Sequence, residues 1–202
     1  MTNTQNHKQR KKEIIITGFG GQGIILAGFI LGKAAAIGEH MESTLVQSYG
    51  PESRGGSCSA QVVISDEIIH YPYVNHPDIL VCMSQSGYDK LIKQMKQKGT
   101  LIIDKDLVRP SRGLKYDFFS IPATRMAEEL GRTMIANIVM LGFLTAVTDV
   151  ISMDSAQMAI GESVPKGTEE LNSNAFKKGH DYGLATLKGR QKKATGQAGA
   201  IS

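Results

Sequence analysis

Short apolar runs alternate with longer stretches of helical periodicity along the first half of the chain. Each run is rich in β-branched or aliphatic residues and is bounded by polar or glycine-rich segments, as is typical of buried strands. We expect these strands at Glu13–Thr17, Thr44–Ser48, Asp78–Met83 and Leu101–Asp104. Helical periodicity marks Ile24–Ile37 and Tyr88–Lys98. The alternation of strands and helices predicts an α/β fold with a mostly parallel sheet.

Two turn signals refine this order. Gly38 follows the last periodic residue of the first predicted helix, and we expect it to cap the C-terminus of that helix. The runs Ser57–Ser65 and Glu67–Tyr71 are separated by a short polar step. This spacing favours a hairpin that turns at Ser65-Asp66.

The C-terminal third of the chain has a helical pattern. We expect helices at Ala123–Leu130, Thr133–Thr148, Met153–Gly161 and Thr168–Leu187. These extra C-terminal helices should cover the sheet, so that helices lie on both of its faces. No internal repeat is present, and 202 residues with 41% hydrophobic content fit one globular domain. We therefore predict a single domain over residues 13–187, flanked by disordered basic tails at 1–12 and 188–202.

The first predicted helix is unusually apolar. Lys33 is its only charged residue before Gly38, whereas a helix on the outside of an α/β sheet normally keeps one polar face. Gly28 and Gly32 lie four residues apart and permit a close approach of another backbone. Either the C-terminal helices of the same chain cover this helix, or it forms an interface with another subunit.

The distribution of charge argues against a nucleic-acid-binding protein. The formal net charge is +4, but residues 1–12 and 185–202 together contribute eight positive charges and no acid, which leaves −4 for residues 13–184. Solvated tails explain the basicity, and no nucleic-acid partner is expected.

The cysteine content excludes several kinds of metal centre. Cys58 and Cys82 are the two cysteines of the chain, and an iron–sulfur cluster requires about four thiolates. A cysteine-rich zinc site is excluded for the same reason, and no other metal motif stands out. The isolated thiols suit a reducing, cytoplasmic compartment. No apolar run approaches the roughly 18 residues of a membrane-spanning helix, and the polar N-terminus lacks the apolar stretch of a secretory signal.

A glycine-rich segment lies directly between the first predicted strand and helix. Its residues Gly18, Gly20 and Gly23 match the pattern G-x-G-x-x-G, with Gly21 and Gln22 between them. A helix N-terminus offers free amide groups and a partial positive charge, so this turn suits a phosphate or another anion. A turn that serves only strand-to-helix packing is the alternative.

The sequence gives poor support to NAD as the ligand of this turn. An NAD site uses an acidic residue at the end of the second strand to bind the ribose. Glu39 and Glu42 have a suitable spacing but precede that strand, which ends at Gln47-Ser48-Tyr49.

A second polar segment follows the C-terminal end of the next predicted strand, where open α/β sheets bind their ligands. It combines hydroxyl groups, a carboxylate, an arginine and glycines. Its candidate binding residues are Ser48, Tyr49, Gly50, Glu52, Arg54, Gly55 and Gly56. The Arg54 guanidinium suits a phosphate or carboxylate, although a solvated turn with an Arg–Glu pair is possible.

Catalytic groups are scarce elsewhere. The histidines show no ligand spacing, and we expect Cys58 and Cys82 to be small buried hydrophobic residues. Asn137 lies in an apolar helix and needs a hydrogen-bond partner, either the backbone or a ligand. We predict no catalytic residue on this chain alone.

These segments resemble the gamma subunit of 2-oxoacid:ferredoxin oxidoreductases. The resemblance rests on the motifs Glu13–Gly23, Ser48–Gly56, His76–Leu80 with Ser84-Gln85, Leu101–Asp104, Ile121–Thr124, Asn137–Gly142 and Asn174–Phe176. They occur in order over residues 13–184. Ser53 stands where the family often has alanine, and the basic tails are not part of the pattern.

The resemblance implies a Rossmann-like domain within a complex of alpha, beta and ferredoxin-like delta subunits. Such an enzyme oxidatively decarboxylates a 2-oxoacid to an acyl-CoA and passes two electrons to ferredoxin. Thiamine diphosphate and the iron–sulfur clusters would lie on partner subunits, and the gamma subunit is implicated in coenzyme A binding or access. The form of the Ser48–Pro51 motif favours the 2-oxoglutarate type.

Two other functions stay open at this point. A stand-alone nicotinamide- or flavin-dependent oxidoreductase would use the glycine motif, but it lacks the ribose-binding acid. A purely structural interaction subunit would use both glycine-containing segments for packing.

Overall fold

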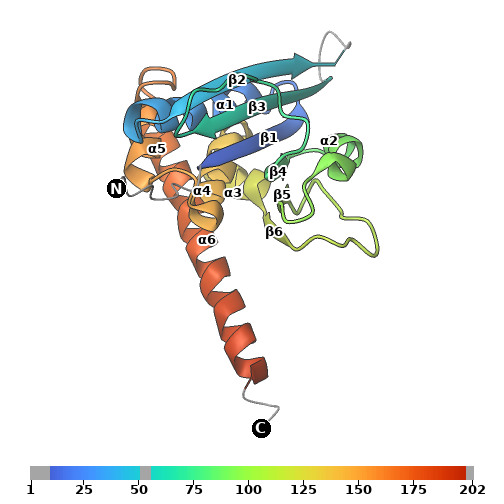
Figure 1. The fold of residues 1–202 in the computed structure, drawn as a ribbon. Helices are drawn as coiled ribbons and strands as arrows, with labels where there is room; N and C mark the ends of the chain where they lie inside the picture. The colour runs from blue at the N-terminus through green and yellow to red at the C-terminus, as the bar shows by residue number, and fades with distance from the viewer. Residues whose placement is uncertain (1–9, 51–55, 199–202) are drawn as a thin grey trace, which may run out of the picture.

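The computed structural model describes residues 10–50 and 56–198, with side chains as far as residue 195. Within them, six strands form one mixed sheet in the order β2-β3-β1-β4-β5-β6 (Figure 1). The strands are β1 Lys11–Phe19, β2 Glu42–Tyr49, β3 Ser57–Ser65, β4 Ile79–Cys82, β5 Thr100–Asp104 and β6 Phe118–Ile121. Parallel pairing joins β1 to β4, β4 to β5 and β5 to β6. The predicted α/β fold with a mostly parallel sheet is confirmed.

One strand, β3, is not parallel to its neighbours, and its direction decides which chain segments meet at the C-terminal ends of β1 and β2. β3 lies between β1 and β2 and runs antiparallel to both. Phe19 is opposite Ser57, and Tyr49 is opposite Cys58. The C-terminal ends of β1 and β2 therefore meet the N-terminal end of β3 at one edge.

The predicted hairpin around Ser65-Asp66 is wrong. β3 already has a neighbour on each side, so no free edge is left for residues 67–71, which form no strand. The chain instead crosses the sheet, where the amide of Val74 donates a hydrogen bond to Gln61 Oε1 over 2.8 Å. The apolar side chains of Ile68 and Tyr71 remain 73% and 54% exposed.

The helices follow the expected order with shifted bounds. They are α1 Ile24–Lys33, α2 Gln85–Leu91, α3 Ala123–Glu129, α4 Ala136–Thr148, α5 Met153–Gly161 and α6 Glu169–Ala198. α2 begins before Tyr88 because Ser84 Oγ caps it by accepting a hydrogen bond from the amide of Gly87. It passes into a short 3-10 turn over Ile92–Gln94 and ends before the predicted Lys98.

Gly38 does not take the predicted capping conformation. α1 continues into a π-helix over Ala34–Gly38, and the left-handed residue is His40, with φ of 54°. A side chain at position 38 would clash with Ser155 of α5. Gly38 therefore serves helix packing rather than chain reversal.

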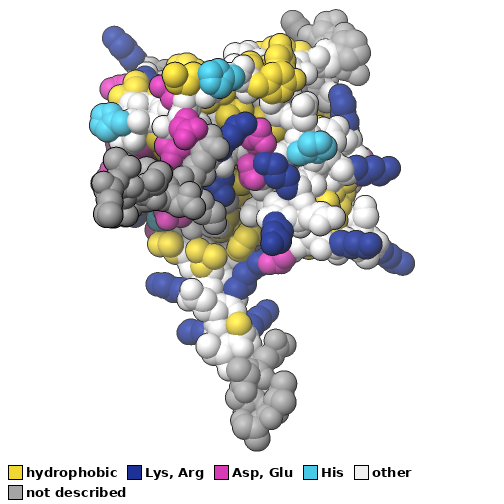
Figure 2. All heavy atoms as spheres, viewed as in Figure 1, with side chains coloured by type: hydrophobic (Ala, Val, Ile, Leu, Met, Phe, Trp, Pro, Cys, Tyr) yellow, Lys and Arg dark blue, Asp and Glu magenta, His cyan; other side chains and the backbone are white. Residues whose placement is uncertain are grey.

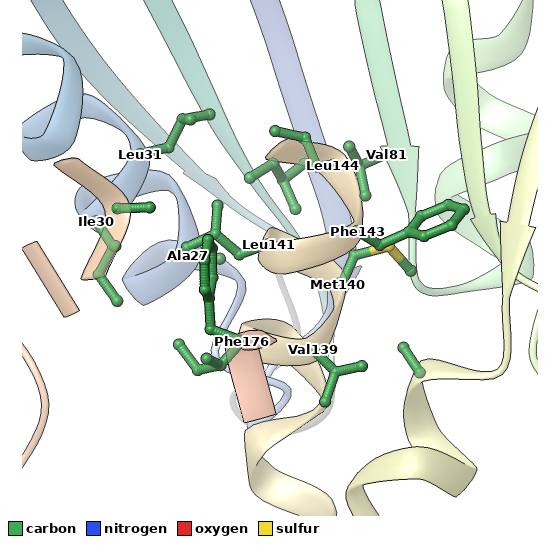
Figure 3. Packing of buried hydrophobic residues seen from close by; sticks show 14 of the residues in the cluster. Ala27, Ile30, Leu31, Val81, Val139, Met140, Leu141, Phe143, Leu144 and Phe176 are labelled. Atoms are coloured by element: carbon green, nitrogen blue, oxygen red, sulfur yellow. The ribbon is translucent and has the colours of Figure 1, made fainter. Parts of the chain in front are cut away.

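The two faces of the sheet are covered unequally (Figure 1). Helices α1 and α3–α6 lie over the face that carries Ile14, Ile16 and Val81. Figure 3 shows side chains of α1, α4 and α6 meeting in this core, among them Ala27, Leu141 and Phe176. On the opposite face, α2 and the neighbouring loops cover Ile15, Leu80 and Leu101. Helices thus occupy both faces, as predicted, but the C-terminal helices are confined to one.

α1 is only partly enclosed by its own chain. Ile30 and Leu31 are fully buried, and Lys33 Nζ lies 2.9 Å from a carboxylate oxygen of Glu162, which follows α5. Phe29 and Ile37 remain 47% and 52% exposed. The C-terminal helices therefore cover one side of this apolar helix, and apolar side chains on its other side remain exposed.

The observed elements extend past both predicted ends of the domain. β1 begins at Lys11 and α6 continues past Leu187 to Ala198, whereas residues 1–9 and 199–202 lie outside the described part. α6 crosses α4 closely, since a side chain at Gly142 or Gly179 would clash with the facing backbone. In the described ranges, no helix combines the length and apolar character that crossing a membrane requires.

An ion-pair cluster ties the start of β1 to the start of β4. Lys96 Nζ lies 2.9 Å from Glu13 Oε2 and 3.0 Å from Asp78 Oδ1, and Lys11 Nζ lies 3.0 Å from Glu13 Oε1. Partial burial alone would raise the pKa of Glu13, but hydrogen bonds and charge from Lys96 and Lys11 lower it overall. Glu13 thus stabilises the fold in its ionised form.

Glu13→Gln should lower the free energy of unfolding at neutral pH by about 1 kcal/mol, because the ion pairs are only partly buried. Since the pKa of Glu13 is lowered by folding, its contribution is present above its unfolded pKa and is lost as pH falls through the folded value. Urea denaturation at neutral pH and at about pH 3 checks this expectation. A difference between variant and wild type that persists undiminished at the lower pH would contradict it.

Candidate functional site

The two predicted glycine-containing segments meet at one edge of the sheet. The amide of Gly20 in the turn after β1 donates a hydrogen bond to the carbonyl of Gly56 over 2.9 Å. The amide of Gly50 donates to the carbonyl of Ser57 over 2.6 Å, which holds together the ends of β2 and β3. The glycine turn is therefore adjacent to Gly56, which directly precedes β3, although the two are well separated in sequence.

Gln22 fixes the shape of the glycine turn. Its Oε1 accepts a hydrogen bond from the amide of Phe19 over 2.7 Å, and its Nε2 donates to the carbonyl of Met83 over 3.1 Å. A side chain at Gly18 would clash with Gln22 and Ile24. Gln22 therefore joins the ends of β1 and β4, and both of its polar side-chain atoms are occupied within the chain.

Gly23 forms the N-cap of α1 and contacts α4. Its φ of 70° is left-handed, and a side chain there would clash with Asn137. Asn137 is 2% exposed, and its Nδ2 donates a hydrogen bond to the Gly23 carbonyl over 2.9 Å. The backbone is thus the partner of Asn137. Gly21, with φ of 95°, faces open space.

The N-terminus of α1 is suited to an anion. No side chain caps this helix, and its first turn contains no acidic residue. The first amide groups of a helix have no acceptor within the helix, and its dipole places partial positive charge there. A negatively charged group would be stabilised beside this turn.

A small hollow lies beside the β2–β3 connection. Ser48, Tyr49 and Gly50 line it together with Lys90 of α2, and further lining residues are Thr17, Ser57, Cys58, Ser59, Gly87 and Leu91. Its volume is about 60 Å³. Lys90 is exposed and has no ion pair within the described residues. We call this feature the hydroxyl hollow; it offers hydroxyl groups and one positive charge.

A second hollow, of about 180 Å³, lies on the α4 side of the glycine turn. Gly21, Gly23, Asn137 and Arg132 line it, and most of its other lining residues are apolar, among them Leu26, Met134, Ile135, Val164 and Leu171. We call it the apolar hollow. The exposed Arg132 is its one basic residue.

Several predicted residues lie outside the described part of the chain. They are Glu52, Arg54 and Gly55, with the intervening Ser53. Their proposed roles in anion binding therefore stay predictions.

Lys90 and Arg132 were missed by the sequence analysis. Each is an isolated basic residue near a helix end, a pattern shared with many surface residues. The fold brings Lys90 next to Ser48 and brings Arg132 next to Gly21. The one available signal for Lys90 was its position in the helix that follows β4, a strand whose C-terminal end lies at the same edge of the sheet.

The strand order explains the poor fit to a dinucleotide site. In that motif the second strand neighbours the first, so its terminal acid reaches the ribose. Here β3 separates β2 from β1, and the end of β2 carries no carboxylate. Glu39 instead accepts a hydrogen bond from the amide of Ser152, and hydrogen bonds from Ser155 and Ser152 lower its pKa.

Other polar residues near this edge have structural roles. Asp104 Oδ2 accepts hydrogen bonds from the amide of Thr124 over 2.9 Å and from its hydroxyl over 2.7 Å. Cys58 and Cys82 are 6% and 0% exposed, and burial raises the pKa of both thiols. Their prediction as small buried hydrophobic residues is confirmed.

Comparison with known proteins identifies the family to which this chain belongs. The model of the family "Pyruvate ferredoxin/flavodoxin oxidoreductase" matches residues 13–182. The chain is 52% identical over 174 residues to the 2-oxoglutarate synthase subunit KorC of Methanocaldococcus jannaschii, covering 85% of this chain and 93% of that protein.

Solved structures agree. The gamma subunit of a keto/oxoacid ferredoxin oxidoreductase from Geobacter sulfurreducens superposes with a TM-score of 0.76 at 37% identity, covering 86% of this chain and 99% of that one. A 2-oxoglutarate:ferredoxin oxidoreductase from Magnetococcus marinus has the same fold, with a TM-score of 0.74 at 22% identity. The match covers 87% of this chain but 31% of that longer chain.

The chain therefore belongs to the pyruvate ferredoxin/flavodoxin oxidoreductase family. Within that class it is a gamma-type subunit of a 2-oxoacid:ferredoxin oxidoreductase, an enzyme complex of several subunits. The family resemblance identified from the sequence motifs is confirmed.

Gly21 and Gly23 provide a matched pair for testing the turn. Gly21→Ala should lower the free energy of unfolding by about 1 kcal/mol, because only its positive φ opposes a side chain. Gly23→Ala should cost about 3 kcal/mol or more, because the new methyl group also displaces Asn137. Urea denaturation followed by circular dichroism measures both, and equal losses would show that the Asn137 contact is unimportant.

Proposed function

We propose that this chain is the gamma subunit of a thiamine diphosphate-dependent 2-oxoglutarate:ferredoxin oxidoreductase in the cytoplasm. The complex would convert a 2-oxoacid, here 2-oxoglutarate, and coenzyme A to an acyl-CoA and carbon dioxide while two electrons reduce ferredoxin. The 52% identity to a 2-oxoglutarate synthase subunit supports this choice of substrate.

The redox cofactors would belong to other subunits. Cys58 and Cys82 are the chain's two cysteines, and they contribute to the cores on opposite faces of the sheet, so they cannot ligate a common cluster. Alpha and beta subunits would hold thiamine diphosphate, and a ferredoxin-like delta subunit would hold clusters. This chain would supply binding surface rather than a nucleophile or an electron path.

Coenzyme A is the ligand that we propose for the sheet edge of this chain. The observation that carries this proposal is the Gly20–Gly56 hydrogen bond, which places the glycine turn beside the β2–β3 connection. The uncapped N-terminus of α1 lies on one face of the sheet, and Lys90 of α2 lines the hydroxyl hollow on the other face, beside the end of β2. Phosphate groups match these donors, because amide dipoles and a lysine stabilise negative charge.

The residues at this edge would act by binding and orientation. The Lys90 amine would contact a phosphate oxygen, and the hydroxyl groups of Ser48 and Ser59 would donate hydrogen bonds nearby. Gln22 would keep the turn rigid, so that little ordering is required when the ligand binds. The thioester-forming chemistry would take place on the partner subunits.

Lys90→Gln tests this role in the assembled enzyme. Loss of one exposed positive charge should weaken coenzyme A binding roughly threefold to tenfold, because a contact of 1.4 kcal/mol corresponds to a factor of ten. Calorimetric titration with coenzyme A and the KM for coenzyme A should both show the change, whereas the KM for 2-oxoglutarate should not. Lys93→Gln is the matched control, since Lys93 is also exposed and lies outside the hollow. Equal behaviour of the two variants would exclude Lys90 from the site.

A structural role is the second candidate function. Gly18, Gln22 and Gly23 all make contacts that packing alone would require. If this chain only supports the complex, enzyme assembled without it would retain its coenzyme A affinity and its turnover.

A further inference from the structure

α6 extends beyond the part of the chain that is shared with the family. The family match ends at residue 182, and the gamma subunit from Geobacter is covered over 99% of its length by 86% of this chain. α6 nevertheless continues to Ala198. Figure 1 shows this end of the helix projecting away from the sheet and the other helices. We call residues 188–195 the helical extension.

Arg190 anchors the helical extension to the body. Its guanidinium donates hydrogen bonds to Asp117 Oδ2 and to the carbonyl of Phe118, and its central carbon lies 3.8 Å from the centre of the Phe119 ring. Phe118 and Phe119 belong to β6, the edge strand of the sheet. These contacts fix the direction in which the helix leaves the body.

The helical extension presents positive charge to the solvent. Lys188, Lys192 and Lys193 are exposed, and residues 188–195 contain no acidic residue. Figure 2 shows basic side chains along this projecting part of the molecule. Apart from Arg190, its described side chains are exposed, so no buried face stabilises it.

A helix of this composition needs a partner to be stable. Polar helices that bury no face are marginal in water unless pairs of opposite charge along the helix support them. Residues 188–195 contain no acidic residue to form such pairs, and Arg190–Asp117 is the one ion pair of the described extension. It also lacks the apolar face of a membrane-surface helix and the aromatic residues that stack on nucleic-acid bases. These features favour a negatively charged protein surface as the partner of the helical extension.

We propose that the helical extension docks against an acidic face of a neighbouring subunit of the oxidoreductase complex. This inference rests on the proposed function. A permanent subunit would supply the missing contacts at all times, whereas a dissociating electron carrier would leave the helix unsupported between encounters. The contacts of the helical extension would add to those made by residues 13–182, which the family shares.

The test compares two triple variants in the co-expressed complex. K188E/K192E/K193E reverses the charge of the helical extension, and K93E/K98E/K105E makes the same change in net charge at exposed lysines elsewhere. Glutamate and lysine have similar helix propensities, so the helix should be preserved. Native mass spectrometry and size-exclusion chromatography at about 0.15 M salt would measure retention of the gamma chain.

We expect the extension variant to weaken association roughly tenfold or more, with the control variant close to wild type. The wild-type complex should also lose its gamma chain more readily as salt is raised. Equal retention of both variants, or an extension variant that changes only the KM for ferredoxin or only RNA binding, would overturn the proposal. If wild-type gamma fails to associate with the alpha and beta subunits at low salt, the proposed function itself fails instead.

Discussion

The insertion of β3 between β1 and β2 is the constraint on which the candidate site depends. Because β3 runs antiparallel to both neighbours, its first residue lies opposite the last residue of β1. The β2–β3 connection is thereby brought to the glycine turn, where Gly20 and Gly56 share a hydrogen bond. The same insertion moves β2 by one strand spacing, about 4.8 Å, away from the turn. A single topological change thus removes the geometry of a dinucleotide site and forms the edge that we propose as a ligand site.

Packing and ligand binding are compatible functions of the glycine turn. Gln22 and Asn137 use their side-chain donors to hold the turn against β4 and α4. These contacts immobilise the backbone without occupying the first amide groups of α1, whose N-cap has no side-chain partner. A turn that is already rigid loses little entropy when an anion binds. The glycine spacing therefore serves packing, and this packing would leave the amide groups available to the proposed ligand.

The sequence predicted the parts of the fold whose signals are local. β1, β4 and β5 are buried on both faces and carry continuous apolar runs, so their positions were close to correct. β6 was missed because it is short and mostly half-buried, and Glu67–Tyr71 was misassigned because its apolar side chains face solvent. Strand order and the hollows depend on long-range pairing. The glycine turn could be found from its pattern, whereas Lys90 becomes informative only when α2 is placed beside Ser48.

The proposed ligand edge and the proposed docking helix occupy separate regions of this molecule. Figure 1 shows the projecting end of α6 far from the C-terminal end of β2 and the start of β3. The sheet edge belongs to residues 13–182, which the family shares, whereas the helical extension lies beyond them. Residues 13–184 carry a net charge of −4, whereas the extension carries only positive charge. Docking of the extension as proposed would change the strength of assembly without altering the proposed ligand edge, because the two share no described contact beyond the common core.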